Sequence, residues 1–418
     1  RLTLLLCCIL TLSFSTASSQ TSPETLFSDG FAKYTEGKYN EAIATFLKAD
    51  STRPLAKLLF YLGSSYAALN DYLNAINALQ KSVGLEPNNS GNRYQLARMF
   101  AQSGLANDAA REYLAITQTD TSYLPAFFQL GLIHTDRRQF REALQLNRYI
   151  INNNPRDFLA YYQAASSYVS LGENDSARMA IDSCLSINPK YIPAINLSAS
   201  LYFSKKNYHE ARQQYLLASV LRPEKADFIF KVGLCEAKLD SHTLAIESFK
   251  KAIALDSLDE SYYANLGQAY YKASYVDSSL TAYSKAAEID NENPIVFINL
   301  ALAWAQLDST NNAVATYNRA VATYHPEKIS EVYMKLGSLF FGKSRYREAI
   351  IAFQKAREFQ PSNLLALFYT AWAYENLDDK KNAIRELERF LNLAGHDTTK
   401  KSHVNQAKWM LNQLKNKN

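Results

Sequence analysis

The sequence has little glycine, proline or cysteine. It contains 13 Gly and 11 Pro in 418 residues, far fewer turn residues than a β-sandwich or β-barrel of this length needs. Four cysteines exclude a disulfide-dense scaffold. Charge of one sign is lacking as well, since 45 Lys and Arg stand against 40 Asp and Glu. A nucleic-acid-binding protein would show a dominant basic excess, so no nucleic-acid partner is expected.

Aromatic and apolar residues are plentiful. Hydrophobic residues make up 47% of the chain, with 28 Tyr and 21 Phe, so a large core can be buried and disorder is excluded as the dominant state. This composition favours a long helical chain. Cys184 and Cys235 fall on expected buried helix positions in different helical segments, where packed free thiols are favoured over a disulfide or a metal site.

The one long apolar run lies at the N-terminus. It extends from Leu2 to Phe14 behind Arg1, and Ala17 and Ser19 supply the small residues that a signal peptidase needs. Residues 1–19 are therefore predicted to be a signal peptide, with a mature chain from Gln20 and no transmembrane segment in it. The alternatives are a membrane anchor, for which the run is short, and a lipoprotein anchor at Cys7 or Cys8, past which the apolar run continues.

A small residue recurs through the chain with a period of about 34. The spacings are 33, then 34 seven times, then 36, then 34. Such a period is typical of a repeat architecture. The series is Ala42, Ala75, Ala109, Ala143, Ala177, Ala211, Ala245, Ser279, Ala313, Ala349 and Ala383.

Other positions keep the same phase. Glycine or alanine stands twelve residues before each small residue, larger apolar or aromatic residues mostly stand four residues after it, and proline often stands twelve after it. Offsets of 3, 4 and 7 place residues on one helix face, and small residues let two helix axes approach closely. Proline ends each unit because it cannot continue a helix. Each period is thus predicted to be a helical hairpin, helix A then helix B.

These positions resemble the tetratricopeptide repeat (TPR) family, seen well in Ser198-Ala199, Tyr202, Tyr208, Ala211 and Tyr215. The resemblance implies an all-α fold, an α-solenoid of about eleven TPR hairpins forming a right-handed superhelix. The array is expected over 20–395. Local departures, such as a proline-free stretch in repeat three and a two-residue insertion near His325, are expected to bend or loosen the stack.

A capping helix and basic tail are expected at 396–418. Over 402–415, Val404, Ala407, Leu411 and Leu414 share a face, and polar residues oppose it. Solenoids need such a polar-backed cap because an end repeat leaves its core face open.

One face of the A helices carries a strip of apolar and aromatic residues. In the TPR family this face lines the concave groove, so a protein or peptide partner is predicted to bind there. The alternative is that these residues pack against neighbouring A helices. Lys57, Arg98, Asn265 and Asn299 are too scattered for the carboxylate clamp of some family members. The predicted groove residues are Phe60, Tyr94, Phe128, Tyr162, Phe203, Phe230, Tyr271, Phe341, Phe368 and Trp372.

Three other patterns are weighed as sites. Residues 337–344, GSLFFGKS, fit the phosphate-loop pattern, but Gly337 occupies a mid-helix repeat position where the amides are already bonded. The six histidines show no metal-ligand spacing, so no metal, cofactor or catalytic residue is predicted. An arginine cluster could dock an acidic partner, although a solvated surface is favoured. It consists of Arg137, Arg138, Arg141, Arg148 and Arg156.

The sequence therefore predicts a non-catalytic, exported TPR scaffold. Its place would be the periplasm or cell surface of a Gram-negative bacterium, with a protein partner of unknown identity. Two alternatives stay open at this point: a nucleotide-binding or enzymatic regulator built around the phosphate-loop match, and a glycan-binding protein that uses the groove tyrosines and tryptophans.

Overall fold

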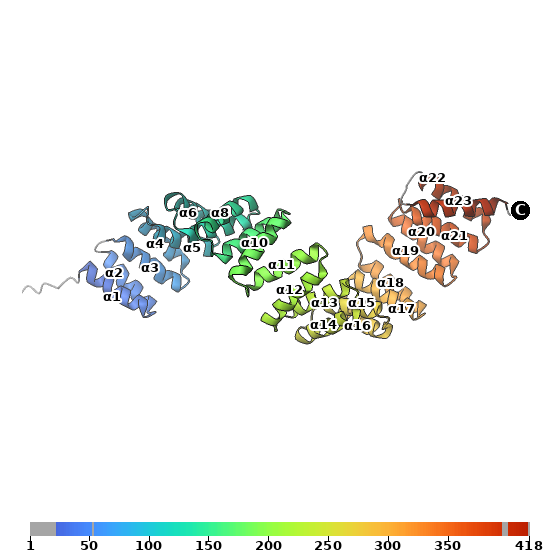
Figure 1. Cartoon of the computed structure of the whole chain (residues 1–418), viewed down its shortest axis with the longest axis horizontal. Coiled ribbons are helices and arrows are strands. Elements are labelled where there is room, and N and C mark those ends of the chain that lie inside the picture. Colours follow the sequence, from blue (N-terminus) through green and yellow to red (C-terminus); the bar gives the residue numbers. More distant parts are fainter. Residues whose placement is uncertain (1–21, 52–53, 395–399, 417–418) are drawn as a thin grey trace, which may run out of the picture. The chain divides into compact units, whose positions relative to one another are not determined.

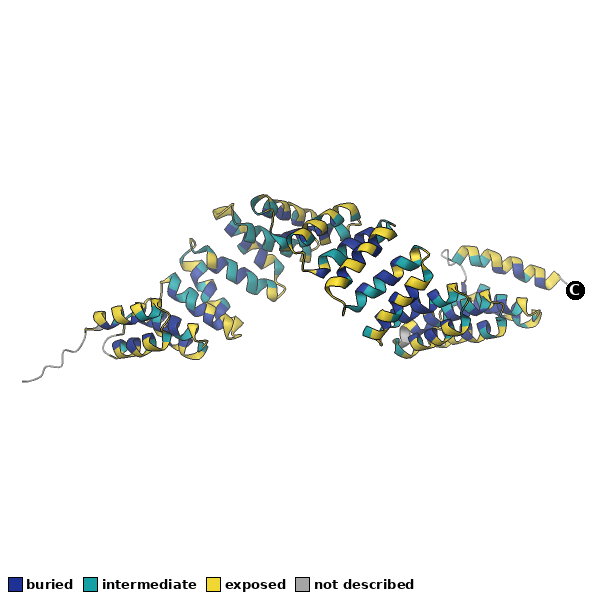
Figure 2. Ribbon diagram, turned by 90° about the horizontal axis from the view of Figure 1, so that it is seen from below, coloured by how far each residue is buried: buried dark blue, intermediate teal, exposed yellow. Residues whose placement is uncertain are grey.

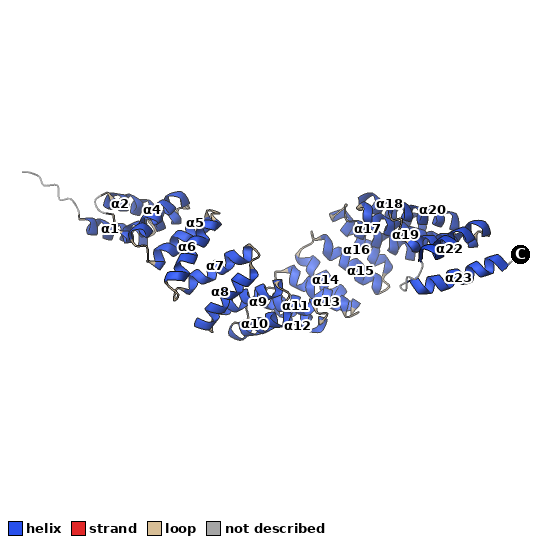
Figure 3. Ribbon diagram, turned by 90° about the horizontal axis from the view of Figure 1, so that it is seen from above, coloured by secondary structure: helices blue, strands red, loops and turns tan. Residues whose placement is uncertain are grey.

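The chain folds into helical hairpins from end to end of its described part. The computed structural model describes residues 22–51, 54–394 and 400–416. Those residues form helices and no strand (Figure 3), which confirms the all-α class. The helices are α1 (Pro23–Thr35), α2 (Tyr39–Asp50), α3 (Ala56–Ala68), α4 (Tyr72–Leu85), α5 (Ser90–Gln102), α6 (Ala106–Thr119), α7 (Leu124–Asp136), α8 (Phe140–Asn153), α9 (Phe158–Ser170), α10 (Asn174–Ile187), α11 (Ile192–Ser204), α12 (Tyr208–Leu221), α13 (Ala226–Lys238), α14 (His242–Leu255), α15 (Glu260–Lys272), α16 (Val276–Ile289), α17 (Pro294–Gln306), α18 (Thr310–Thr323), α19 (Pro326–Gly342), α20 (Tyr346–Phe359), α21 (Leu364–Asn376), α22 (Lys380–Ala394) and α23 (Lys401–Asn416).

Odd-numbered helices up to α21 are the predicted A helices, and the even-numbered helices that follow them are the B helices (Figure 1). All eleven small residues of the 34-residue period lie on B helices and are fully buried. Ser279 fits this position because its hydroxyl donates to the Gly267 carbonyl oxygen of the facing helix, at 2.9 Å. Figure 2 shows buried positions where helices meet. The predicted hairpin contacts are confirmed.

The turn within each hairpin contains one residue in the left-handed region, a second feature with the 34-residue period. Glycine, which adopts this conformation without a Cβ penalty, fills it at three hairpins only. The other eight accept a side chain there, so their turns carry backbone strain that the rest of the hairpin must offset. These residues are Gly37, Asn70, Gly104, Arg138, Gly172, Lys206, Asp240, Ser274, Asp308, Ser344 and Asp378.

The turns between hairpins are organised by Asn or Asp as well as by proline. Asn154, Asn188, Asp256 and Asp290 each follow a B helix and accept a hydrogen bond from the amide two residues on, at 2.9–3.4 Å. Such a side chain mimics a backbone turn. The signal is a polar residue just before the period's proline position, and sequence analysis overlooked it.

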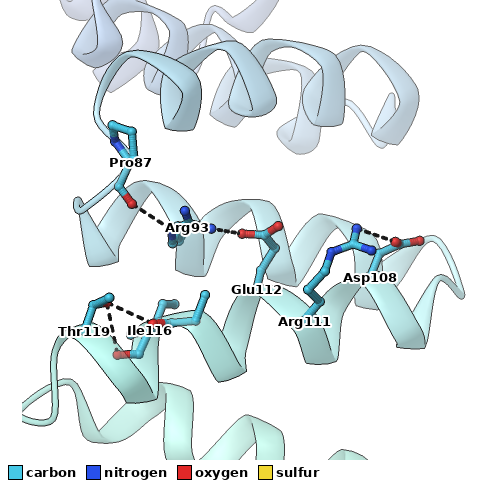
Figure 4. Close-up of polar contacts among 8 residues, drawn as sticks. Pro87, Arg93, Asp108, Arg111, Glu112, Ile116 and Thr119 are labelled. Carbon is cyan, nitrogen blue, oxygen red and sulfur yellow. Dashed lines mark hydrogen bonds and ion pairs between the residues drawn. The ribbon is translucent and has the colours of Figure 1, made fainter.

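The proline-free turn of repeat three is held by Asp120. Its side chain accepts hydrogen bonds from the Ser122 amide and hydroxyl, and from the Ser90 hydroxyl at the start of α5 in the same repeat, at 2.7 Å. Arg93 of α5 donates to the Pro87 carbonyl at 2.7 Å and pairs with Glu112 of α6 (Figure 4). The Asp120 contacts join the two ends of the repeat where no proline ends the helix, and the bond to Pro87 links the repeat to the turn before it.

The C-terminal helix α23 covers the last hairpin, as predicted. Ala407, Met410 and Leu414 are buried in one cluster with Leu387 and Phe390 of α22. Val404 and Leu411 are half-buried at its edge, and Met410 is a core residue that the sequence pattern missed. The opposite face, which holds Asn405, Lys408, Asn412 and Lys415, is exposed.

The described residues form two compact units. One ends at Ala194 and the other begins at Ile195, so the division falls within α11, a place that sequence analysis did not foresee. The handedness of the superhelix stays a prediction. The predicted signal peptide, residues 1–19, lies outside the described residues.

Candidate functional site

The candidate site is the A-helix surface, which we define as the strip formed by the ten predicted groove residues and their neighbours on odd-numbered helices. Nine of those ten residues are half-buried. The exception is Phe368, which is 1% exposed and packs on Phe390 with ring centroids 5.6 Å apart. Phe368 therefore belongs to the core of its own repeat and offers no surface to a partner.

Several of the half-buried rings connect adjacent A helices. Phe230 of α13 lies 4.6 Å from Tyr262 of α15 between ring centroids, and Phe341 of α19 lies 5.1 Å from Trp372 of α21. These rings therefore pack between repeats, the alternative weighed from the sequence, and also keep part of their surface exposed. Such packing fixes the rings, and rigid aromatic anchors are the side chains that dominate binding hot spots.

The remaining predicted residues are held by their own repeat or by the turn that follows. Tyr94 lies 5.3 Å from Tyr123, and Tyr162 lies 5.2 Å from Tyr191, in both cases the aromatic residue before the next A helix begins. Burial raises the pKa of Tyr162, so its phenol stays neutral. The other four residues each pack beside a further aromatic residue of the same hairpin. The neighbours are Tyr61 for Phe60, Phe127 for Phe128, Tyr208 for Phe203 and Tyr283 for Tyr271.

An aromatic cluster at the N-terminal end of the A-helix surface is larger than the sequence indicated. Phe31 is 36% exposed and lies 4.9 Å from Tyr61 between ring centroids, and Tyr34 lies 5.3 Å from the same ring. Lys57 sits over the Phe27 ring at 5.3 Å. Tyr34 occupies the repeat position of Phe203 and Tyr271 but was left out of the predicted groove, whereas Tyr61 lies one helix position away from that face.

Three of the four scattered clamp candidates have local contacts. Arg98 donates to Gln95 on its own helix at 3.1 Å, and Asn265 donates to the Ser261 carbonyl of its own helix at 2.8 Å. Lys57 lies over the Phe27 ring. That these residues form no carboxylate clamp stays a prediction.

The arginine cluster is an exposed surface with local partners. All five arginines are exposed. Arg137 donates to Asn107 at 2.6 Å, and Arg148 donates to the Tyr168 hydroxyl at 2.7 Å and lies over its ring. Each of these contacts joins neighbouring repeats. The solvated reading of the cluster fits these positions.

The phosphate-loop match is helical. Gly337 to Gly342 all belong to α19, and the amide of Lys343 donates back to the Leu339 carbonyl. Lys343 pairs with Asp308, and Ser344 is the left-handed residue of a hairpin turn. A phosphate cradle requires free amides after a strand, so this segment does not form one.

The two cysteines of the described residues lie in the packed interior. Cys184 and Cys235 are buried free thiols, as predicted, and burial raises the pKa of Cys184 to about 11 and that of Cys235 to about 12. Both thiols are therefore protonated and unreactive at neutral pH. In the described part of the chain, no cluster of three or more His, Cys, Asp or Glu could hold a metal ion, and no helix has the length and apolarity to cross a membrane.

A large cavity lies away from the predicted groove residues. Its volume is about 1050 Å³, and it is lined from α15, α16 and α17, with Tyr263, Tyr270 and Trp304 as its aromatic walls. None of the ten predicted residues lines it. The cavity was not predicted, because its A-helix residues lie at repeat positions adjacent to those of the predicted groove residues.

Comparisons with known proteins agree with the repeat geometry. Two family models described as tetratricopeptide repeat match residues 56–89 and 159–191 in one case, and residues 197–260 and 334–395 in the other. The matches support the tetratricopeptide repeat family. The two segments matched by the first model begin at α3 and at α9 and each cover one hairpin, whereas those matched by the second model begin within α11 and within α19.

Curated relatives of this chain are distant. It is 22% identical over 300 residues to the BBSome complex member BBS4 homolog of Drosophila melanogaster, which covers 71% of this chain and 57% of that protein. It is 24% identical over 321 residues to a TPR repeat-containing protein of Methanocaldococcus jannaschii, covering 71% and 55%. The chain spans about half the length of the curated relatives it matches.

Solved structures with similar helical arrays include yeast Tom70 and a tetratricopeptide repeat protein from Parabacteroides merdae. The Tom70 structure has a TM-score of 0.42 and 16% identity, covering 94% of this chain and 96% of that chain. The P. merdae structure has a TM-score of 0.44 and 16% identity, covering 59% and 98%.

Proposed function

We propose that this chain is a non-catalytic TPR scaffold that binds a protein partner through the A-helix surface. One observation about the predicted groove rings carries the proposal: nine of the ten are half-buried and packed against apolar or aromatic neighbours, yet keep exposed area. A fixed ring loses little conformational freedom when a partner covers it. The TPR array itself fits a protein partner.

The proposal extends to an exported protein of the bacterial cell envelope, in the periplasm or at the cell surface. Its support is the apolar run from Leu2 to Phe14 followed by Ala17 and Ser19. Intact mass of the exported form should correspond to a chain that begins at Gln20. A mass that still includes residues 1–19 would contradict export by signal-peptide cleavage.

The absence of catalysis is part of the proposal. It is supported by a repeat array that occupies α1 to α22 and by thiols that burial keeps protonated. One curated relative is named Protein O-mannosyl-transferase TMTC3, of Homo sapiens, but this chain covers only 30% of that protein. Measuring nucleotide binding by the folded chain tests the main alternative, because the phosphate-loop match predicts binding and its helical geometry predicts none.

Partner capture tests the surface. The double variant Phe128→Ala, Tyr162→Ala removes two rings of the first compact unit and should abolish capture of the natural partner from envelope extract, provided that helicity and melting stay those of wild type. The matched control changes three exposed arginines of the same unit, Arg137, Arg138 and Arg141, to Ser. That control should weaken capture slightly, and less so at high salt. If the aromatic double variant folds normally and still captures the partner, the A-helix surface is the wrong site.

A further inference from the structure

A cavity of about 470 Å³ lies between α17 and α19, within the second compact unit. Leu302 and Ala305 of α17 form one wall, Met334 and Leu339 of α19 form the other, and Tyr317 of α18 lies between them. Leu302 and Met334 belong to the apolar strip of the A helices. The cavity is therefore a local depression in the A-helix surface.

The cavity coincides with the longest spacing of the array. The period is 36 residues here, and α19 has 17 residues where most A helices have 13. After α16, the amide of Asp290 donates back to the Ala286 carbonyl and closes the helix end. After α18, Tyr324 has φ −88° and ψ 148°, against φ −123° and ψ 102° for Asp290. The insertion therefore lies at the junction between α18 and α19, and residues of both helices line the cavity.

The hydroxyl of Tyr317 makes no hydrogen bond with another described residue. In repeat six, three periods earlier, the Tyr215 hydroxyl lies 3.1 Å from the Ser200 hydroxyl in a hydrogen bond. The residue that corresponds to Ser200 in repeat nine is Leu302, whose side chain cannot hydrogen-bond. Tyr317 is 1% exposed overall, but its oxygen is not enclosed by protein and Tyr317 lines the cavity, so the hydroxyl is available to a group that enters there.

The charges around the cavity select an uncharged group. Its two charged residues, Glu331 and Lys335, are one helical turn apart on α19, with Nζ and Oε1 at 3.7 Å, and offset each other. The remaining lining residues are apolar or hydroxyl-bearing. A charged side chain entering here would lose hydration and find no free counter-charge.

We propose that this cavity takes one uncharged apolar side chain from an extended segment of the protein partner, and that the Tyr317 hydroxyl donates to a backbone carbonyl of that segment. The segment is extended because carbonyls within a helix already accept hydrogen bonds from their own helix, whereas those of an extended chain are free. The inference rests on the proposed function and adds the class of residue that the partner supplies.

N-acetyl-leucinamide is the probe, since it carries a leucine side chain and backbone carbonyls with no charge. In the full chain labelled at methionine methyl groups, increasing probe concentration should shift the Met334 resonance saturably. Met99 and Met410 are buried elsewhere and Met179 is exposed, so these three report nonspecific effects. N-acetyl-lysinamide should leave the Met334 resonance in place.

Two variants and a matched control test the hydroxyl. Tyr317→Phe should weaken probe binding about two- to tenfold, the loss of one hydrogen bond. Leu302→Ser should also weaken it, because it restores the partner that Tyr215 has. Tyr215→Phe, the control, should leave binding unchanged.

A Met334 shift no larger than that of Met179, or equal affinities for Tyr317→Phe and Tyr215→Phe, would overturn the inference. So would a Tyr317→Phe chain that captures the partner as well as the Tyr215→Phe chain does. Failure of the proposed function would give a different result. The Phe128→Ala, Tyr162→Ala variant, in which this cavity is intact, would then capture the partner as well as wild type does.

Discussion

Two glycines at the same repeat position offer a matched test of how tightly the hairpins are packed. Gly131 and Gly233 are each the eighth residue of their helices, α7 and α13. A Cβ added to Gly233 would lie 2.6 Å from Cε1 and 2.8 Å from Cδ1 of Phe249, which is itself fully buried. A Cβ added to Gly131 would meet nothing nearer than 3.8 Å, because Asn147 stands where other repeats carry an aromatic ring.

The two Gly→Ala changes should therefore have opposite signs. Alanine is favoured over glycine within a helix by about 1 kcal/mol, and Gly131→Ala should gain most of that. Gly233→Ala gains the same but forces the Phe249 ring aside, and overpacking a tight core costs about 1–3 kcal/mol. Since Phe230 packs on that ring with centroids 5.5 Å apart, the ring has little room, and the net effect should be destabilising by about 0–2 kcal/mol.

Native-state hydrogen exchange measures both effects in place. Repeat arrays lose stability locally, so protection should fall in α13 and α14 for Gly233→Ala and rise in α7 and α8 for Gly131→Ala. Circular dichroism of both variants confirms that helix content is kept. Equal stabilisation by the two changes would refute the close contact between position eight of helix A and the ring of helix B.

Three further expectations concern single positions. Ala211→Trp should push α12 from its facing helix at a cost of about 1–3 kcal/mol or more, with hydrogen-exchange protection lost first in the hairpin of α11 and α12. Lys206→Gly should raise the melting temperature and Gly172→Ala should lower it, because both residues have positive φ and left-handed backbone costs roughly 1–2 kcal/mol for a residue with a Cβ. Hydrogen bonds from Ser122 and Ser90 lower the pKa of Asp120. The ionised carboxylate therefore stabilises the folded chain fully above the ordinary aspartate pKa, and this stabilisation is lost as pH falls through the lowered pKa. Hydrogen exchange of the amides in the α6–α7 turn should rise on acidification, and Asp120→Asn should remove that pH dependence.

Most of the fold was predictable because one short pattern is copied eleven times. Burial of Ala42, Ala211 or Ala383 follows from the same helix offsets, so an error at one repeat is corrected by the others. The unpredicted features lie where a copy departs from the pattern or where two copies meet. The division within α11 and the cavity beside Tyr317 both depend on how neighbouring helices pack, which one copy of the pattern does not show.

The surface was less predictable than the core. The strip of A-helix aromatics could be read from the sequence, but whether a ring is buried depends on its neighbours. Phe368 is covered because Phe390 and His403 both stack near it, and His403 comes from α23, outside the repeat pattern. The cavity beside Trp304 lies between consecutive hairpins, so no single period reveals it.

Because a left-handed turn residue recurs in each hairpin, the number of hairpins can change while the structure of each hairpin stays the same. Asp240 and Ser274 occupy the same turn position, 34 residues apart, with φ of 55° and 65°. A chain that lacked residues 241–274 would pass from Asp240 directly to Tyr275, and α13 would be followed by α16 through a turn of the same geometry. Gly233 would then face the ring of Tyr283, which in the present chain packs against Gly267, in place of the ring of Phe249. Gain or loss of whole periods can thus change the length of the array without requiring a new packing solution, so length is a property that evolution can adjust in steps of one hairpin.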